Sequence, residues 1–345
     1  MRTKLLIALI LASITHLSMA ATVPHKLRFS QRTDVNKFIQ QMVKDEHFKK
    51  ADLETLFDKV EIQAKVIPSI SKPHEAMPWY RYRPIFLTQK RVVKGVDFWK
   101  HHKKELQRAE KRFGVPANII VAILGVETYY GKIQGSYHVI DTLSTLSFNY
   151  PPRSKFFRKE LTQFLLLCRE QKLNPLKPLG SYAGAIGQPQ FMPSSYRHYA
   201  IDFDGDGVSD LMTKETDVIG SVANYFKENG WKKGGMVVER AAVTGDKFKQ
   251  INTRKRKPRL LLADLQHFGV TPLGKLDANT KTRFFVLNDK DKDEYWLGLN
   301  NFYVITRYNT SKHYAMAVYE LSQELTKAMQ EKPQTAATES VKKHG

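Results

Sequence analysis

The segment 118–132 is apolar at positions 119–121, 123, 124 and 126, so a helix formed there is apolar almost all the way round. Such a helix has to be buried in the protein interior. Pro116 suits the first helical turn, and Gly131 and Gly135 can end the segment. A single carboxylate, that of Glu127, interrupts the apolar run. Helical spacing places four residues beside it: Ile123, Leu124, Tyr130 and Gly131.

The surroundings of Glu127 support two interpretations. Apolar neighbours penalise an ionised carboxylate, so we expect the pKa of Glu127 to be raised. A carboxylic acid that stays protonated near neutral pH can act as a general acid. The same segment also fits an ordinary core helix in which Glu127 points into solvent or pairs with a lysine. This helix alone does not choose between the two.

Amphipathic periodicity predicts further helices on both sides of this segment. They are expected from Asp34 and from Asp52, over 98–113 and 156–171, from residue 218 onward, and after Ser311. Asp34 and Ser311 are expected as N-caps, because their side-chain oxygens can accept hydrogen bonds from free backbone N–H groups. The pattern predicts a mainly α protein.

The helical pattern fails in two regions. Prolines punctuate the first, at positions 68, 73, 78 and 84. The aromatic and arginine residues 79–83 are therefore expected on a loop, where the rings can stack on sugars or can equally pin the loop to the core. The second region, residues 231–294, contains short strand-like runs and turns, so the fold class is α+β. Strands are expected at 236–238, 284–287, 294–297 and 302–307.

These patterns predict a chain made of several parts. The expected parts are a signal peptide over 1–20, a helical N-terminal lobe over 21–97, a core over 98–230, a small β-containing lobe over 231–300, a strand and helix returning to the core over 301–330, and a disordered tail over 331–345.

Charge and the N-terminal segment narrow the class of partner. Lys and Arg outnumber Asp and Glu by 55 to 34, a net charge of +21, so nucleic acid, acidic lipid and acidic glycan are candidate partners. Basic residues, an apolar run and Ser18-Met19-Ala20 match a secretory signal peptide cleaved before Ala21. An uncleaved anchor is the alternative, although the run is shorter than the ~20 residues that span a bilayer. Export argues against nucleic acid.

Three further segments carry candidate chemistry. The Gly- and Pro-rich run 180–193 can approach a ligand closely and aim Ser181 and Gln190 into a cleft, but no G-x-S-x-G motif surrounds Ser181. The single Cys168 cannot form an internal disulfide and is expected as a small core residue. The basic run 254–259 is expected as a solvated loop or as a contact to an anionic wall.

The segment 202–210 fits a calcium loop. Acids stand at loop positions one, three, five and nine, with glycine at position six. Position twelve is Thr213, where a glutamate is usual, and Asp217 could close a longer loop. We favour Ca²⁺ binding, because clustered carboxylates repel one another without a cation. A metal-free acidic turn is the alternative.

Five motifs occur in the order of one known family. They are Gly114-Val115-Pro116, Gly125-Val126-Glu127-Thr128, the run 180–196, the Asp202 loop and the run 301–309. In these motifs the chain resembles the lytic murein transglycosylase B family over residues 34 to 328. The resemblance implies a lysozyme-like catalytic core flanked by a helical lobe and a small β-containing lobe. It also implies cleavage of the MurNAc–GlcNAc β-1,4 bond of peptidoglycan, leaving 1,6-anhydro-MurNAc ends.

The resemblance also implies roles for individual residues. Glu127 matches the family's catalytic acid and later base. The matching substrate-binding residues are Tyr82, Arg153, Ser181, Gln190, Tyr225, Tyr308, Asn309 and Tyr314. The matching calcium ligands are Asp202, Asp204, Asp206, Val208 through its carbonyl, and Asp217. One extra residue precedes Asp217 relative to the family pattern. The Ca²⁺ is expected to be structural, and no cofactor is expected for catalysis.

The resemblance implies a location as well. The membrane-bound member from which the family takes its name is a lipoprotein, and no Cys stands near the cleavage point of this chain. A soluble periplasmic monomer that acts on glycan strands, with peripheral association with anionic envelope surfaces, is therefore implied. Two other functions compete, a hydrolytic muramidase and a non-catalytic wall-binding protein.

Overall fold

The computed structural model describes residues 28–71 and 77–331, so the expected signal peptide and residues 332–345 of the expected tail lie outside it. The chain divides into two compact units, Met1–Lys59 and Val60–Gly345. Residues 60–97, expected in one lobe with the N-terminal helices, belong to the second unit. Hydrogen bonds tie the start of this segment to the second unit. The backbone N–H groups of Glu61 and Gln63 donate to the side chains of Asp141 and Thr145.

The first unit is a helical pair. After the 3₁₀ turn η1 (Phe29–Gln31), helices α1 (Thr33–Glu46) and α2 (Lys50–Phe57) bury their apolar faces, and the rings of Phe38 and Phe57 meet edge to face at 5.9 Å. The prediction that Asp34 caps α1 was wrong. Arg32 is the N-cap, and Asp34 lies in the first turn with its carboxylate on the Arg32 guanidinium at 2.9 Å. An acid there still favours the helix electrostatically.

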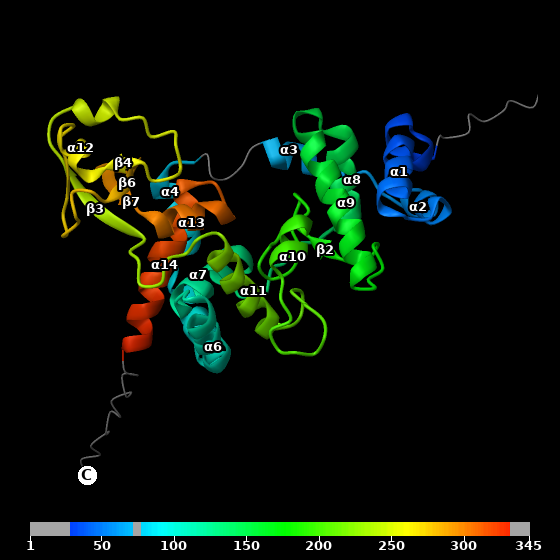
Figure 1. Ribbon diagram of the computed structural model, residues 1–345, viewed down its shortest axis with the longest axis horizontal. Coiled ribbons are helices and arrows are strands. Elements are labelled where there is room, and N and C mark those ends of the chain that lie inside the picture. Colours follow the sequence, from blue (N-terminus) through cyan, green and yellow to red (C-terminus); the bar gives the residue numbers. More distant parts are fainter. Residues whose placement is uncertain (1–27, 72–76, 332–345) are drawn as a thin grey trace, which may run out of the picture. The chain divides into compact units, whose positions relative to one another are not determined.

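Most of the second unit is helical (Figure 1). Its first helices are α3 (Val66–Ser71), α4 (Trp79–Phe86), α5 (Gln89–His101), α6 (Lys103–Phe113), α7 (Ala117–Thr128), α8 (Val139–Asn149) and α9 (Ser154–Glu170). They are followed by α10 (Pro193–Tyr199), α11 (Glu215–Glu228), α13 (Asn300–Tyr308) and α14 (Lys312–Gln330). The helix expected over 98–113 is two helices, because His102 leaves the helical conformation (φ −103°, ψ 29°). Ser311 caps α14 as predicted, accepting from the N–H groups of His313 and Tyr314.

Two predicted non-helical segments are helices. Residues 79–83 belong to α4, because Pro78 acts as the N-cap and Trp79 and Tyr82 are buried on one side of the helix. The strand expected at 302–307 lies in α13, where β-branched residues suggested a strand but Phe302 and Ile305 pack as one helical face. Asn301 holds the start of α13 through hydrogen bonds with Lys232 and Gly235.

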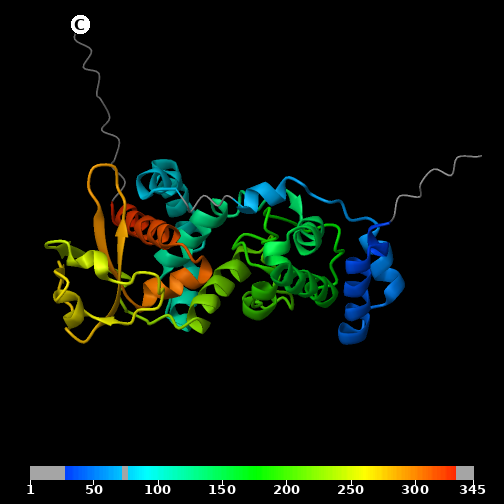
Figure 2. The same cartoon turned by 90° about the horizontal axis from the view of Figure 1, so that it is seen from above.

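The β-containing lobe is an antiparallel sheet with its own core. Strands β3 (Val238–Val243), β4 (Leu260–Leu261), β5 (Val270–Pro272), β6 (Lys281–Leu287) and β7 (Glu294–Gly298) are arranged in the order β4-β6-β7-β3-β5. Figure 2 shows β6 and β7 as a long hairpin. Helix α12 (Leu262–Gln266) and the 3₁₀ turn η4 (Lys247–Gln250) border the sheet. Seven residues form the buried core: Ala241, Ile251, Leu262, Leu265, Val270, Phe284 and Leu297.

Helix α7 lies in the core of the second unit, as its apolar composition predicts. Ten of its twelve residues are buried, and α5, α6, α11 and α14 pack around it. The ring of Tyr130 fills the space between α5 and α7, where a Cβ atom added to Gly95 or Gly125 would lie 2.4 or 2.7 Å from its hydroxyl. That hydroxyl donates to the carbonyl of Arg91 at 2.9 Å. Glycines at these positions therefore let the two helices approach.

Candidate active site

Helix α7 ends directly after Glu127 and Thr128. The next three residues have left-handed backbone angles, with φ of 53° at Tyr129, 61° at Tyr130 and 80° at Gly131, so the chain turns sharply away. Thr128 joins this turn to the loop 180–193, because its hydroxyl donates to the carbonyl of Gln188 at 2.8 Å and accepts from the N–H of Gly131 at 3.0 Å. The carboxylate of Glu127 thus stands on a rigid helix end.

Glu127 lines a cleft of about 540 Å³ within the second unit. The walls come from the 3₁₀ turn η3 (Pro151–Arg153) and the first two turns of α9, from the loop before α10 and the start of α10, from α11, and from the end of α13 with the residues after it. Polar residues and aromatic rings alternate along these walls. The lining includes Arg153, Phe156, Glu160, Ser181, Tyr182, Gln190, Phe191, Ser194, Tyr225, Arg307, Tyr308 and Asn309.

Two tyrosines lie beside the carboxylate of Glu127. The hydroxyl of Tyr314 donates to its Oε1 at 2.5 Å, and the rings of Tyr314 and Tyr308 stack at 6.4 Å. Burial, followed by the charge of Glu127, raises the pKa of both phenols. Both tyrosines therefore stay neutral, and Tyr314 can donate a hydrogen bond to Glu127 across the physiological pH range. Glu127 itself is half-buried, and the raised pKa expected for it stays a prediction.

The glycine-rich loop presents Ser181 and Gln190 to the cleft, as expected. The Oγ atom of Ser181 accepts from the N–H groups of Ala183 and Ala185 at 3.2 and 3.1 Å. Gln190 has a φ of 49°, a strained value for a residue with a side chain, and its Nε2 donates to the carbonyls of Gln134 and Gly187. Such strain persists only where surrounding contacts fix the backbone.

The remaining predicted substrate-binding residues fall into two groups. Arg153, Tyr225, Tyr308 and Asn309 line the cleft. Tyr225 is fixed by a hydrogen bond from its hydroxyl to the carbonyl of Arg307 at 2.7 Å, and the guanidinium of Arg153 lies 4.4 Å from the ring of Phe156. Tyr82 and Tyr314 do not line the cleft. Both are buried, and Tyr82 packs among the rings of Trp79, Phe86 and His313.

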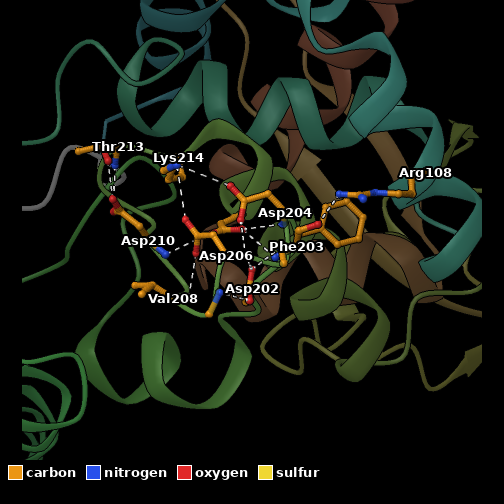
Figure 3. Close-up of polar contacts among 12 residues, drawn as sticks. Arg108, Asp202, Phe203, Asp204, Asp206, Val208, Asp210, Thr213 and Lys214 are labelled. Atoms are coloured by element: carbon orange, nitrogen blue, oxygen red, sulfur yellow. Dashed lines mark hydrogen bonds and ion pairs between the residues drawn. The ribbon is translucent and has the colours of Figure 1, made fainter.

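The predicted calcium loop brings three of its five expected ligands together. One carboxylate oxygen from each of Asp202, Asp204 and Asp217 lies within 4.8 Å of the others. Asp217 is buried and accepts from the N–H groups of Phe203, Asp204 and Asp210, so it organises the loop. Asp206 is not part of this group, and Figure 3 shows Lys214 reaching towards both Asp206, at 3.5 Å, and Asp204, at 3.8 Å.

The donor set of this loop fits a hard cation. Carboxylate oxygens are the ligands that Ca²⁺ prefers, and the three grouped acids supply negative charge at short spacing. Gly205 and Gly207 have φ of 86° and 94°, which allows the chain to wrap tightly around the carboxylates. The N–H groups of both glycines donate to Asp202, which orients that carboxylate.

Comparison with known proteins places the chain in a family. The model of the family described as "Transglycosylase SLT domain" matches residues 30–323. The chain belongs to the transglycosylase SLT family. It is 41% identical over 305 residues to the membrane-bound lytic murein transglycosylase B of Escherichia coli (strain K12), covering 86% of this chain and 83% of that protein. This SLT-family member therefore shares nearly its whole length with that relative.

Solved structures agree with this membership of the SLT family. The catenated lytic transglycosylase SltB1 from Pseudomonas aeruginosa has a TM-score of 0.83 and 48% identity, over 86% of this chain and 98% of its own. The Escherichia coli lytic transglycosylase Slt35, solved in complex with calcium and with bulgecin A, has a TM-score of 0.81 and 40% identity, over 87% and 95% of the two chains. The expected lysozyme-like fold with helical and β-containing parts is thereby confirmed.

Sequence reasoning missed one carboxylate in the cleft of this SLT-family protein. Glu160 of α9 is buried, and its two oxygens accept from the N–H and the hydroxyl of Ser194, at 2.9 and 2.7 Å. Burial raises the pKa of Glu160 and outweighs these hydrogen bonds, which lower it. A signal was present, because Glu160 falls on the same helical face as Phe157, Leu161 and Phe164, where a charged residue is unusual. Its contacts indicate that it anchors the start of α10.

Proposed function

We propose that Glu127 is the general acid and then the general base of a lytic transglycosylase reaction on peptidoglycan. The protein is a transglycosylase of the peptidoglycan-cleaving SLT family. The observation that carries the assignment is the position of Glu127 at the end of a buried helix, lining the cleft while Tyr314 donates a hydrogen bond to its carboxylate. The second cleft carboxylate, Glu160, has both oxygens engaged by Ser194.

In this proposal one carboxyl group serves both halves of the reaction. Protonated Glu127 donates its proton to the glycosidic oxygen as the bond from C1 of MurNAc to that oxygen breaks. Ionised Glu127 then takes the proton of the C6 hydroxyl of the same sugar as O6 forms its bond to C1. No water is consumed, so the new end is a 1,6-anhydro ring. Because the attacking hydroxyl belongs to the same sugar, closure benefits from the high effective concentration of oriented groups.

Ser181 is suited to assist at the sugar N-acetyl group. Its Oγ lone pairs accept from two backbone N–H groups, which leaves the hydroxyl proton to be donated elsewhere. The lining of the cleft described above contains no histidine that could activate Ser181 as a nucleophile. We therefore assign Ser181 to hold the N-acetyl oxygen of MurNAc, which meets positive charge developing at C1.

The other lining residues are assigned to glycan binding. Rings such as Tyr225 and Tyr308 offer faces and edges to sugars, and Asn309 and Gln190 offer amides. Arg153 lies on the cleft wall with its guanidinium available to an acidic group of peptidoglycan. Tyr82 and Tyr314 are assigned a supporting role, because both are buried and neither lines the cleft.

Digestion of purified sacculi tests the assignment. The wild-type protein is expected to release muropeptides ending in anhydro-MurNAc, whereas Glu127→Gln keeps the fold and releases none. Mass spectrometry distinguishes the competing muramidase, whose reducing-end products are heavier by one water. Substantial release by Glu127→Gln would reject Glu127 as the acid. Sacculi that bind the wild-type protein without any release would indicate a wall-binding protein without catalytic activity.

We also propose that the Asp202 loop binds a structural Ca²⁺. A homologous Slt35 structure is in complex with calcium, and Asp202, Asp204 and Asp217 supply suitable oxygens here. The ion would neutralise the acidic loop between α10 and α11. Calcium is expected to raise the melting temperature, and EGTA to lower it, while Asp217→Asn removes the response. An identical melting temperature in calcium and EGTA would contradict this.

A periplasmic location completes the proposal. The relative is a membrane-bound murein transglycosylase, and peptidoglycan lies in the cell envelope. None of the helices formed by residues 28–71 and 77–331 combines the length and the apolar character that crossing a bilayer requires. Export through the signal peptide predicts that the mature protein begins at Ala21. N-terminal sequencing of protein from a periplasmic extract tests this, and a chain that keeps Met1 would contradict it.

A further inference from the structure

A second pocket, of about 190 Å³, lies in the β-containing lobe between the loop 252–259 and strand β6. Its charged lining residues are Lys255, Lys257, Arg259 and Arg283. Asn252, Leu260, Thr282 and Phe284 complete the lining. Among the described residues that form this pocket, four carry positive charge and none is a carboxylate, so the pocket suits an anion.

Arg283 is the most informative member of the pocket. It stands on β6 and is only partly exposed, and its Nε and Nη1 atoms are shielded from solvent without a hydrogen-bond partner in the described structure. Two charged residues interact electrostatically with the Arg283 guanidinium, and both are cations, Arg256 and Lys312. Burying guanidinium donors without partners is costly. An anion in the pocket would offset that cost through its charge.

The neighbouring loop is held in place despite its own charge. Residues 254–259 include five cations, yet the loop is anchored by Arg254 N–H to Asn252 Oδ1 at 3.1 Å and by Arg259 N–H to the carbonyl of Thr282 at 3.0 Å. Within residues 28–71 and 77–331, no ion pair joins this loop to a carboxylate. Like charges fixed close together repel unless an anion lies among them.

A third anchor connects this loop to the catalytic cleft. The Arg256 guanidinium donates to the carbonyl of Thr306 on α13 at 3.1 Å. The following residues, Arg307, Tyr308 and Asn309, line the cleft that contains Glu127. One helical turn is about 5 Å along the axis, so the basic loop meets α13 next to the cleft wall. An anion bound beside this loop is therefore within reach of a polymer that occupies the cleft.

We propose that this basic pocket binds a carboxylate on a peptide stem of peptidoglycan whose glycan strand occupies the cleft. This inference rests on the proposed function. The glycan itself is neutral, because the lactyl group of MurNAc is consumed in the amide link to the stem, so the negative charges of the polymer reside on the stems. A planar anionic membrane would meet the exposed Lys255 and Lys257 first. The partly buried Arg283 fits a single acidic group that enters the pocket.

Binding measurements on the full chain test this proposal. In a Glu127→Gln background, which prevents digestion, we compare affinity for sacculi that keep their stems with affinity for glycan strands stripped of stems by an amidase. The parent is expected to bind the stem-bearing polymer about tenfold or more tightly, the size of a charge-assisted contact. Arg283→Met keeps an unbranched apolar side chain, removes the charge, and is expected to reduce this preference severalfold.

Two further variants keep the test independent of folding. The exposed pair Lys255→Gln and Lys257→Gln is expected to weaken the preference in the same direction, without altering the melting temperature. The pair Lys275→Gln and Lys290→Gln removes the same charge from exposed sites of the same lobe that do not line the pocket, and is expected to preserve the preference.

Three outcomes would overturn the inference. They are a parent that does not distinguish stems, an Arg283→Met variant that keeps the full preference of the parent, and Arg283-dependent binding found only with phosphatidylglycerol vesicles or inorganic phosphate. The proposed function is tested separately, because it fails if Glu127→Gln still releases anhydro-muropeptides. A normal release of these products by the wild type together with absent stem preference rejects only the basic pocket.

Discussion

The Tyr314 hydroxyl and the Glu127 carboxylate are joined by a 2.5 Å hydrogen bond, although 187 residues separate them in sequence. Tyr314 lies in the first turn of α14, directly after the Ser311 cap, and is buried. Glu127 lies at the end of α7, against which α14 packs. The packing of these two helices therefore holds the Tyr314 hydroxyl against Oε1 of Glu127.

Tyr314→Phe is expected to lower kcat about 10- to 100-fold, because a hydrogen bond to a charged group contributes about 1.5–3 kcal/mol. The loss should fall on kcat more than on KM, since Tyr314 lies outside the cleft lining and contacts Glu127. Release of anhydro-muropeptides from sacculi measures both. Tyr196→Phe is the matched control, because it removes a buried tyrosine hydroxyl whose hydrogen-bond partners are Ser209 and Leu211 and not Glu127. An unchanged kcat in Tyr314→Phe would show that the hydrogen bond does not serve catalysis.

The variant Glu160→Gln distinguishes a reaction that uses one carboxyl group from a reaction that uses two. Hydrolytic glycosidases commonly need a second carboxylate, and Glu160 is the other acid in the cleft. Both oxygens of Glu160 accept hydrogen bonds from Ser194. We therefore expect Glu160→Gln to form anhydro products at a rate within about fivefold of the wild type. The variant should lose about 1 kcal/mol of stability, because α10 is anchored more weakly. Loss of activity with normal folding would instead favour a two-carboxylate reaction.

The effect of Glu160→Gln on stability is expected to depend on pH. Burial raises the pKa of Glu160, so the folded protein binds its proton more tightly than the unfolded chain. The stability contributed by this protonation is fully present below the unfolded pKa, near 4.5, and is lost as pH rises through the folded value. The melting temperature of wild type minus that of Glu160→Gln should therefore decrease between pH 4 and pH 7. A difference that increases over this interval would contradict the raised pKa.

Local sequence was sufficient for several features whose pattern depends on neighbours in the chain. The continuous apolar run predicted the buried α7, the Ser311 hydroxyl predicted the start of α14, and the spacing of Asp202 and Asp204 predicted the acidic loop. Each of these signals is complete within one or two helical turns. The resemblance to a family added the identity of the cleft residues that come from distant segments, such as Ser181 and Asn309.

Prediction failed where tertiary contacts overrode local preference. The run 302–307 has the composition of a strand, but Asn301 binds the backbone of Lys232 and Gly235 and Phe302 packs on Phe285, which favours a helix. Glu160 was missed for a related reason. Its partner Ser194 lies 34 residues further along the chain, and only the fold brings the two together.

The thiol of Cys168 is expected to be unreactive in the folded protein. It is buried in α9, and burial raises its pKa to about 12, so almost no thiolate exists at pH 8. Labelling with a thiol reagent at pH 8 should be slow in buffer and complete within minutes in denaturant. Cys168→Ala should leave lytic activity unchanged. Rapid stoichiometric labelling of the native protein would contradict the burial of this side chain.

Lys214 is expected to compete with calcium at the acidic loop. Its ammonium group lies 3.5 Å from Asp206 and 3.8 Å from Asp204, where it partly neutralises carboxylates that would otherwise attract a cation (Figure 3). Lys214→Met removes this charge, so we expect the dissociation constant for Ca²⁺ to fall about two- to fivefold, the scale of one exposed ion pair. Calorimetric titration of the metal into EGTA-stripped protein measures it. Lys227→Met, on the exposed face of α11, is the matched control and should leave the constant unchanged. Weaker calcium binding by Lys214→Met would show that Lys214 supports the loop and does not compete with the ion.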